Sequence, residues 1–221
     1  MKKYLKDIIL GGQDGLVNVF GIILAMASAT QDVRMVVISG LAATFAESLS
    51  MTGVGYTSTK ALKDYYHSKL KEEKHESVHH VDEAKDEIRS IYLKKGFKGT
   101  LLNRIVQKIT SDRKVMVDTM MKEELNLSLE GFESPLRNAA IIGFAAIVGS
   151  LIPLVPFFFV DNIMVAVIAA VMLSTVSLFL TGAIKAKVTV GNWLREGIEL
   201  ALVGMGIALV SYGIGYVLQY V

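Results

Sequence analysis

Two residues in the stretch GLAATFAESLSMTGVGY, residues 40–56, could bind a cation inside a membrane. Glu47 interrupts an apolar run, and Met51 follows it by four residues, so the two share one face of a helix. An ionised carboxylate at the centre of a bilayer costs about 2.5–3.5 kcal/mol, so such a residue usually faces a cavity or a partner. Carboxylate oxygen together with thioether sulfur favours a divalent transition-metal ion over calcium, magnesium or sodium.

A second acid, Asp14, lies in the first apolar segment of the chain. No lysine or arginine lies deep enough in the apolar segments to pair with Asp14 or Glu47, and a cation could supply the missing charge. The face of Glu47 would then be one step of a cation path, with Asn18, Ser50 and Thr52 as further polar candidates. The alternatives are protonated carboxyl groups hydrogen-bonded within a helix bundle and, for Met51, ordinary packing.

A second group of candidate ligands lies in a densely charged block between Lys60 and Glu133. Its members recur at helical spacing. They are Glu73 with Glu76, Glu83 with Glu87, and Met120 with Glu124, with Met121 adjacent and His75, His79 and His80 between the first two pairs. Paired acids on neighbouring helices resemble the carboxylate metal sites of helical bundles. A solvated amphipathic helix shows a similar pattern, and tandem methionines can form the core face of a helix, so both interpretations stay open.

Five apolar segments are long enough to span a hydrocarbon core, which needs roughly 20 residues. They extend over about residues 8–30, 35–59, 139–160, 162–184 and 197–220. The links QDVR and VDN predict two tight hairpins, and frequent small residues allow close packing in lipid. A hydrophobic content of 52% is typical of a membrane protein, and the absence of cysteine excludes disulfides and thiolate metal sites.

The charged block is helical by pattern but not apolar enough to span a membrane. Residues 58–80 predict a rod that continues the second span, and three further helices are expected at residues 81–97, ending at Gly96, at 98–112 and at 112–129. We therefore expect an all-α membrane protein in three parts. Residues 1–59 hold transmembrane helices 1 and 2, residues 60–134 form a small cytoplasmic helical metal-binding domain, and residues 135–221 hold transmembrane helices 3–5.

Basic residues gather at one side of the five expected spans. That side has Lys2, Lys3 and Lys6 before the first span, the basic charged block, and Lys185, Lys187 and Arg195 before the fifth, whereas the other side has Arg34. The positive-inside rule then places the amino terminus and the inserted domain in the cytoplasm, and Val221 on the opposite side. The basic start lacks a small-residue cleavage site, so we expect a retained helix rather than a signal peptide.

Several motifs together resemble the vacuolar iron transporter family. They are DIILGGQDGLVNVFGIILAMASA, LSMTGVGY, MMKEELNL, GSLIPLVPFFF and EGIELALVGMGIA, and they follow one another through the whole chain. The resemblance implies a homodimer of five-helix protomers with the ion path between the two copies of the first helix. It also implies a cytoplasmic domain that collects Fe(II) and often other divalent ions, which leave the cytoplasm in exchange for protons.

The resemblance also assigns residues by position. It implies that Asp14 is the pore aspartate, that Met51 is the pore methionine, and that the inserted domain binds metal through Glu73, Glu76, Glu87, Met120, Met121 and Glu124. Many members have a glutamate where this chain has Ala43, and Glu47 lies one turn closer to Met51 on the same face. At three further positions, some family members have an acidic residue where this chain has another. These positions correspond to Lys3 or its neighbourhood, to His75 and to Ala84. Beside Ala84, Glu83 could act as a shifted substitute.

The expected function is transport of Fe(II), with Mn(II) and similar ions as further substrates, out of a cytoplasm across a prokaryotic plasma membrane. We expect no enzymatic activity, no prosthetic group and no nucleic-acid partner. A metal-gated divalent cation channel without proton coupling is the alternative. A membrane-anchored di-iron oxidase is less favoured, because its Glu-x-x-His motifs, Glu72 with His75 and Glu76 with His79, fall in one stretch rather than on two helices.

Overall fold

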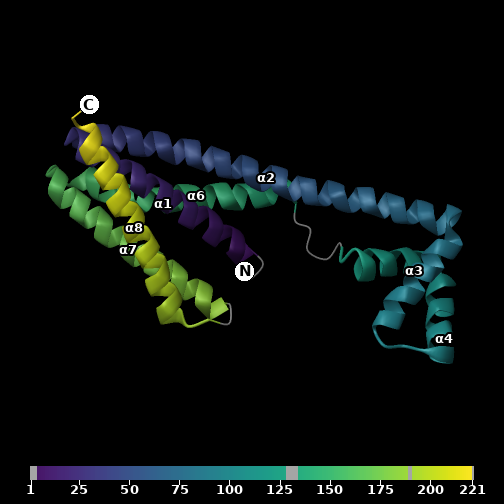
Figure 1. Ribbon diagram of the computed structural model, residues 1–221. Helices are drawn as coiled ribbons and strands as arrows, with labels where there is room; N and C mark the ends of the chain where they lie inside the picture. The colour runs from purple at the N-terminus through teal and green to yellow at the C-terminus, as the bar shows by residue number, and fades with distance from the viewer. Residues whose placement is uncertain (1–3, 128–133, 189–190, 221) are drawn as a thin grey trace. The chain divides into compact units, whose positions relative to one another are not determined.

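A computed structural model describes residues 4–127, 134–188 and 191–220, and all regular structure in these ranges is helical (Figure 1). The helices are α1 (Leu5–Thr30), α2 (Val33–His79), α3 (Val81–Lys94), α4 (Gly99–Thr110), α5 (Arg113–Thr119), the π-helical turn η2 (Met120–Glu124), α6 (Pro135–Phe159), α7 (Ile163–Val188) and α8 (Trp193–Leu218). By length and composition, α1, α2, α6, α7 and α8 can cross a membrane, which confirms the five predicted spans. Lys2, Lys3, Glu133 and Val221 lie outside the described residues, as do residues 128 and 129 of the last helix predicted in the charged block.

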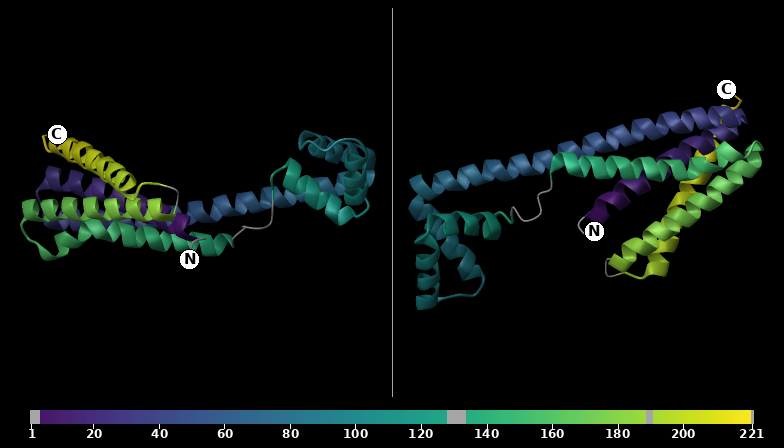
Figure 2. Two further views of the ribbon diagram at one scale, coloured as in Figure 1. Left: turned by 90° about the horizontal axis from the view of Figure 1, so that it is seen from below. Right: turned by 180° about the vertical axis from the view of Figure 1, so that it is seen from behind.

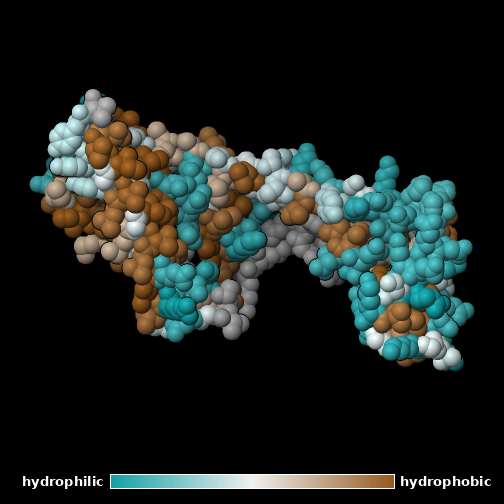
Figure 3. All heavy atoms as spheres, viewed as in Figure 1, coloured by the Kyte–Doolittle hydropathy of each residue, from teal (hydrophilic) through white to brown (hydrophobic). Residues whose placement is uncertain are grey.

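The chain divides into two compact units, which we call the membrane unit and the inserted unit. The membrane unit comprises Met1–Thr57 and Ser134–Val221, and the inserted unit comprises Ser58–Glu133. The helix α2 runs through both without a break, as predicted for the second span and its rod. Brown, hydrophobic side chains predominate on the viewed surface of the membrane unit, whereas the described surface of the inserted unit is mostly hydrophilic (Figure 3).

Small residues bring the helices of the membrane unit into close contact. A Cβ atom on Gly15 of α1 would collide with the carbonyl oxygen of Ala146, and one on Gly149 of α6 would collide with that of Gly12. The backbones of α1 and α6 therefore touch, the arrangement that small residues permit in lipid. Comparable contacts join α8 to α1, at Gly215 against Ala25, and α7 to α8, at Gly182 against Glu196. Figure 2 shows α7 and α8 side by side.

Asparagine and aspartate side chains begin the helices that follow the tight turns. Asp32 Oδ1 accepts a hydrogen bond from the backbone N–H of Arg34 at 2.8 Å. Asn162 Oδ1 accepts from the N–H groups of Met164 and Val165, both at 3.1 Å. Such caps satisfy N–H groups that have no partner within the helix, and they explain the predicted hairpins between α1 and α2 and between α6 and α7.

The inserted unit packs around two apolar clusters. The larger joins α3, α4, α5 and η2 through Ala84, Ile88, Leu102, Val106, Ile109, Met116 and Met120, and the smaller joins α2 to α5 and η2 through Tyr66, Val117 and Met121. The helices expected at residues 81–97 and 98–112 are present as α3 and α4. After α3, Gly96 has a φ of +95°, and the N–H of Phe97 bonds the carbonyl of Tyr92 at 3.1 Å, as in a glycine-terminated helix.

The helix predicted at residues 112–129 differs from the structure. The α-helix ends at Thr119, and a π-helical turn follows in which the N–H of Leu125 bonds the carbonyl of Met120 at 3.3 Å. Met120 and Met121, the first two residues of this turn, are both buried, at 0% and 1% exposed, in different clusters. The predicted helix thus continues over Met120–Glu124 with π-helical rather than α-helical geometry. The prediction of a helix is wrong for residues 125–127, which follow the turn and are not helical.

Candidate functional site

Within the membrane unit, Glu47 of α2 lies beside α1. Its carboxyl group lies close enough to Asp14 and Asn18 to interact electrostatically with both. Asp14 and Asn18 are four residues apart and therefore share one face of α1. Both acids are half-buried, and Asn18 is exposed. The structure thus brings together two acids that the sequence placed on different spans, and it adds the Asn18 amide to them.

The neighbouring hydroxyl groups of α2 are satisfied within their own helix. Thr44, Ser48 and Thr52 each donate a hydrogen bond to the carbonyl four residues earlier, at 2.8, 2.6 and 2.7 Å. Back-bonding of this kind makes a hydroxyl tolerable in an apolar helix. Glu47, in contrast, interacts electrostatically with polar residues of another helix, Asp14 and Asn18 of α1.

Met51 occupies a different environment from Glu47. Its side chain is 9% exposed and packs with Ile142 and Ala146 of α6. This contact favours the packing interpretation that the sequence left open for Met51. Its role as a metal ligand stays a prediction.

Four carboxylates from three helices interact electrostatically in the inserted unit. Glu73 and Glu76 come from α2, Glu87 comes from α3 and Glu124 comes from η2. Glu73 is 5% exposed, and its Oε2 atom has no hydrogen-bond partner among the described residues. Glu76 and Glu87 are half-buried, and Glu124 is exposed. The fold therefore gathers one buried and three more accessible acids that are widely separated in the sequence.

The electrostatics of this carboxylate cluster, Glu73, Glu76, Glu87 and Glu124, follow from its geometry. The pKa of Glu73 is raised to about 7, first by burial and then by the negative charges of Glu76, Glu124 and Glu87. The pKa of Glu87 is also raised, first by burial and then by Glu124 and Glu76. Like charges in a partly desolvated site disfavour the ionised forms. A proton or a divalent cation would relieve this repulsion and would give Glu73 Oε2 a partner.

The remaining candidates lie at the edge of the carboxylate cluster or within the core. Glu83 is exposed, with its Oε1 atom 3.4 Å from His80 Nδ1. The rings of His75 and His79 are tilted by 36° to each other, with their centroids 4.4 Å apart. Met120 and Met121 contribute to the apolar clusters already described. Among the residues that the structure describes, no three His, Cys, Asp or Glu side chains are arranged to hold a metal ion, so coordination would require side chains to rotate.

Known proteins resemble this chain over almost its whole length. A family model described as the VIT family matches residues 5–216. Vacuolar iron transporter 1 of Tulipa gesneriana is 29% identical over 217 residues, covering 98% of this chain and 88% of that protein. Vacuolar iron transporter 1 of Arabidopsis thaliana is 28% identical over 216 residues, covering 98% and 86%. Protein CCC1 of Saccharomyces cerevisiae is 28% identical over 210 residues, covering 91% and 65%.

These similarities agree with the architecture. The names of the plant relatives describe transporters rather than enzymes. Together with five helices long and apolar enough to cross a membrane, they identify an integral membrane protein. The resemblance expected from the sequence motifs is confirmed, since the family match extends from the start of α1 into the last turns of α8. The chain belongs to the VIT family.

Proposed function

We propose that the protein moves Fe(II), with Mn(II) and similar divalent ions as further substrates, out of the cytoplasm in exchange for protons. The relatives named as vacuolar iron transporters support the iron substrate. The observation that carries the proposal is the contact of Glu47 with Asp14 and Asn18 inside the membrane unit. Acidic residues in such surroundings mark ion pathways and proton relays.

The pair of carboxyl groups supplies a simple basis for exchange. A protonated carboxyl can donate a hydrogen bond to its neighbour, whereas an ionised pair offers only acceptor oxygens, which a divalent cation can bind. Glu47 and Asp14 can therefore hold a proton or a metal ion between them, but not both in the same place. Alternating occupancy of one site is the minimal requirement for coupling metal movement to proton movement.

The path is proposed to lie between the α1 helices of a homodimer in a prokaryotic plasma membrane. Support comes from Asn18, which is exposed in the single chain although it lies in an apolar helix beside two acids. The excess of basic residues on one side of the spans supports a cytoplasmic amino terminus and a cytoplasmic inserted unit. The carboxyl terminus then lies on the opposite side.

The inserted unit is proposed to collect the metal ion. The carboxylate cluster supplies the principal ligands, with Glu83, Met120 and Met121 as further candidates. The buried Oε2 atom of Glu73, which has no donor among the described residues, supports this role. A divalent ion is suited to a set of mutually repelling carboxylates, and methionine sulfur adds preference for a transition metal.

Transport and coupling can be tested together in liposomes that contain a pH dye and a metal-sensitive dye. We expect Fe(II) and Mn(II) to cross the membrane with proton movement in the opposite direction. Metal flux that leaves the internal pH unchanged would favour the channel alternative. If the metal-sensitive dye responds no more than in empty liposomes, transport itself is excluded.

A second experiment tests the inserted unit in the full-length protein. Changing Glu73, Glu76, Glu87 and Glu124 to glutamine should lower the apparent metal affinity while flux persists at high metal concentration. The matched control changes four exposed acids of the same unit to asparagine, namely Asp64, Asp82, Asp86 and Asp118. Calorimetry with Mn(II) should show a binding component that the control keeps and the glutamine variant lacks. Equal binding by the two variants would remove this role from the carboxylate cluster.

A further inference from the structure

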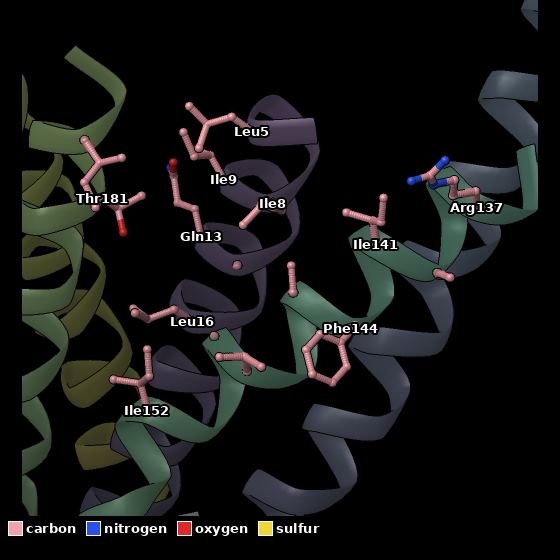
Figure 4. Close-up of a pocket in the computed structure, with 16 residues that line it drawn as sticks. Leu5, Ile8, Ile9, Gln13, Leu16, Arg137, Ile141, Phe144, Ile152 and Thr181 are labelled. Carbon is pink, nitrogen blue, oxygen red and sulfur yellow. The ribbon is translucent and has the colours of Figure 1, made fainter. Parts of the chain in front are cut away.

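An apolar groove lies on the membrane unit between α1, α6 and α7 (Figure 4). Its volume is about 730 Å³. The α1 lining includes the apolar stripe Leu5, Ile9, Gly12 and Leu16, which recur at helical spacing, and it is completed by Ile8 and the polar Gln13. Asp14 lies midway between Gly12 and Leu16 in sequence, about 200° from each around the helix, so the groove is on the side of α1 away from the proposed metal path.

The groove extends along α6 from a charged end into the apolar part of the bundle. Arg137 lies in the first turn of α6 at the charged end, and Phe144 and Ile152 line the groove further along the helix (Figure 4). The carbonyl contacts of Gly11 with Ile142 and of Gly15 with Ala146 show that α1 and α6 run parallel. The charged end therefore lies where both helices begin, at the edge of the hydrocarbon region.

Arg137 supplies a positive charge at this end. Its side chain is exposed, and its guanidinium carbon lies 4.7 Å from the centroid of the Tyr4 ring. Stacking on an aromatic face fixes the orientation of a guanidinium without neutralising it. Among the described residues, Arg137 has no carboxylate within ion-pairing distance. A planar fork of N–H donors therefore remains available to an anion.

A smaller neighbouring pocket adds basic residues to the same end. Its volume is about 410 Å³, it shares Leu5 and Ile9 with the groove, and it is also lined by Lys6 and Lys185. Lys185 Nζ is paired with Glu196 Oε2 at 3.0 Å, and Lys6 has the carboxyl group of Asp7 close by. Lys185 is thus compensated by Glu196. Lys6 forms no ion pair among the described residues, and we expect it to add to a preference for an anion that rests chiefly on Arg137.

We propose that this groove binds an anionic phospholipid, with an acyl chain along the apolar stripe and the phosphate at Arg137. The apolar groove suits the acyl chain of such a lipid, and the basic group at the helix termini suits its phosphate headgroup. Basic pockets between transmembrane helices are suited to anionic headgroups, and the Tyr4–Arg137 pair has the composition of an interfacial anchor. The site requires only that the protein lies in a membrane, and it is independent of metal transport.

Native mass spectrometry of the full chain can test the preference with phosphatidylglycerol and phosphatidylcholine that carry identical acyl chains. We expect the unmodified protein to retain about five times more phosphatidylglycerol, which corresponds to about 1 kcal/mol for one basic residue. Arg137→Gln should bring the ratio close to one. Lys187→Gln is the matched control, because it removes an exposed positive charge from the same end of α7 without touching the groove, and it should keep the preference.

A groove-filling variant tests the acyl-chain part of the site. Ala140 lines the groove and is exposed, so Ala140→Phe should lower the retention of both lipids without altering any charge. Equal retention of the two lipids by the unmodified protein, or an unchanged preference in Arg137→Gln, would overturn the proposal. If Ala140→Phe retains both lipids normally but forms complexes with fewer protomers in native mass spectrometry, a second copy of the chain covers the groove instead.

A thermal-unfolding measurement on the unmodified protein tests the proposal even if the variants do not fold. Trp193, the single tryptophan of the chain, reports the unfolding of the membrane unit. Phosphatidylglycerol should raise the unfolding temperature more than phosphatidylcholine does, and this difference should shrink with salt because the phosphate contact is exposed and screened. A difference that salt does not change would contradict an electrostatic headgroup site.

Discussion

The carboxyl group of Glu47 in α2 lies close enough to that of Asp14 in α1 for the two to interact electrostatically. The short turn between these helices allows two acids from different spans to meet in the membrane unit. Two ionised carboxylates at this separation would repel each other strongly in an apolar medium. A shared proton or a bound cation removes the repulsion, and this is why the pair is central to the proposed exchange.

Asp14→Asn should abolish Fe(II) uptake into proteoliposomes. The substitution keeps the size of the side chain and its capacity for hydrogen bonding, but it removes the negative charge that a divalent ion needs. Asp161→Asn, which removes an exposed carboxylate from the loop before α7, should leave uptake unchanged. Normal uptake by Asp14→Asn would show that the pore assignment is wrong.

Glu47→Gln should abolish metal-dependent proton movement, and metal flux should either stop or become uncoupled from protons. Glutamine can still form a hydrogen bond with Asp14 and Asn18, so a purely structural role would survive the change. Glu199→Gln, an exposed site on α8, is the matched control. The measurement is the internal pH of liposomes during metal entry. Unchanged proton countertransport in Glu47→Gln would assign coupling to Asp14 or to another residue.

The metal-free inserted unit should lose stability as the pH rises from 5 to 8. The pKa of Glu73 is about 7 in the folded state, above its ordinary value of 4.5, so the folded state binds a proton more tightly than the unfolded chain. This stabilisation is complete below about pH 4.5 and is lost as the pH rises through 7. A shift of this size corresponds to a contribution on the order of 3 kcal/mol. Amide-exchange protection factors for α3 and α4, measured in the presence of a chelator, should fall accordingly.

Two variants distinguish this effect from a general response to pH. Glu73→Gln resembles the protonated acid and should remove most of the pH dependence, whereas Asp86→Asn, at an exposed position of α3, should preserve it. Mn(II) added at pH 8 should restore protection in the unmodified protein. Protection factors that stay constant or rise between pH 5 and 8 would contradict the buried environment of Glu73.

Gly149→Ala should destabilise the membrane unit by about 1–3 kcal/mol, the usual cost of overpacking. The new Cβ atom would collide with the backbone carbonyl of Gly12, which cannot move without displacing α1. Gly206→Ala is the control, since a Cβ atom there meets nothing within 4 Å. The fluorescence of Trp193 during thermal unfolding measures both variants. Equal unfolding temperatures would show that α1 and α6 are not held at the observed separation.

The helical elements were largely predictable because their causes are local. Length and apolarity define the five spans, and Asp32 and Asn162 mark the helix starts that follow tight turns. Gly96 marks the end of α3, where its positive φ is required. The exception is the segment that begins at Met120. There a π-helical turn coincides with the burial of two adjacent methionines in different apolar clusters, and no local propensity indicates these tertiary contacts.

The candidate cation ligands could be found from the amino-acid sequence, because Asp14, Glu47 and the acids of the charged block are conspicuous by type and surroundings. Which of these residues lie near one another depends on the packing of the helices. It joined Glu47 to Asp14 rather than to Met51, and it left Glu83 exposed while burying Glu73. The physical reason is that periodicity fixes the face of a helix on which a residue lies, whereas the packing of helices against one another fixes what that face contacts.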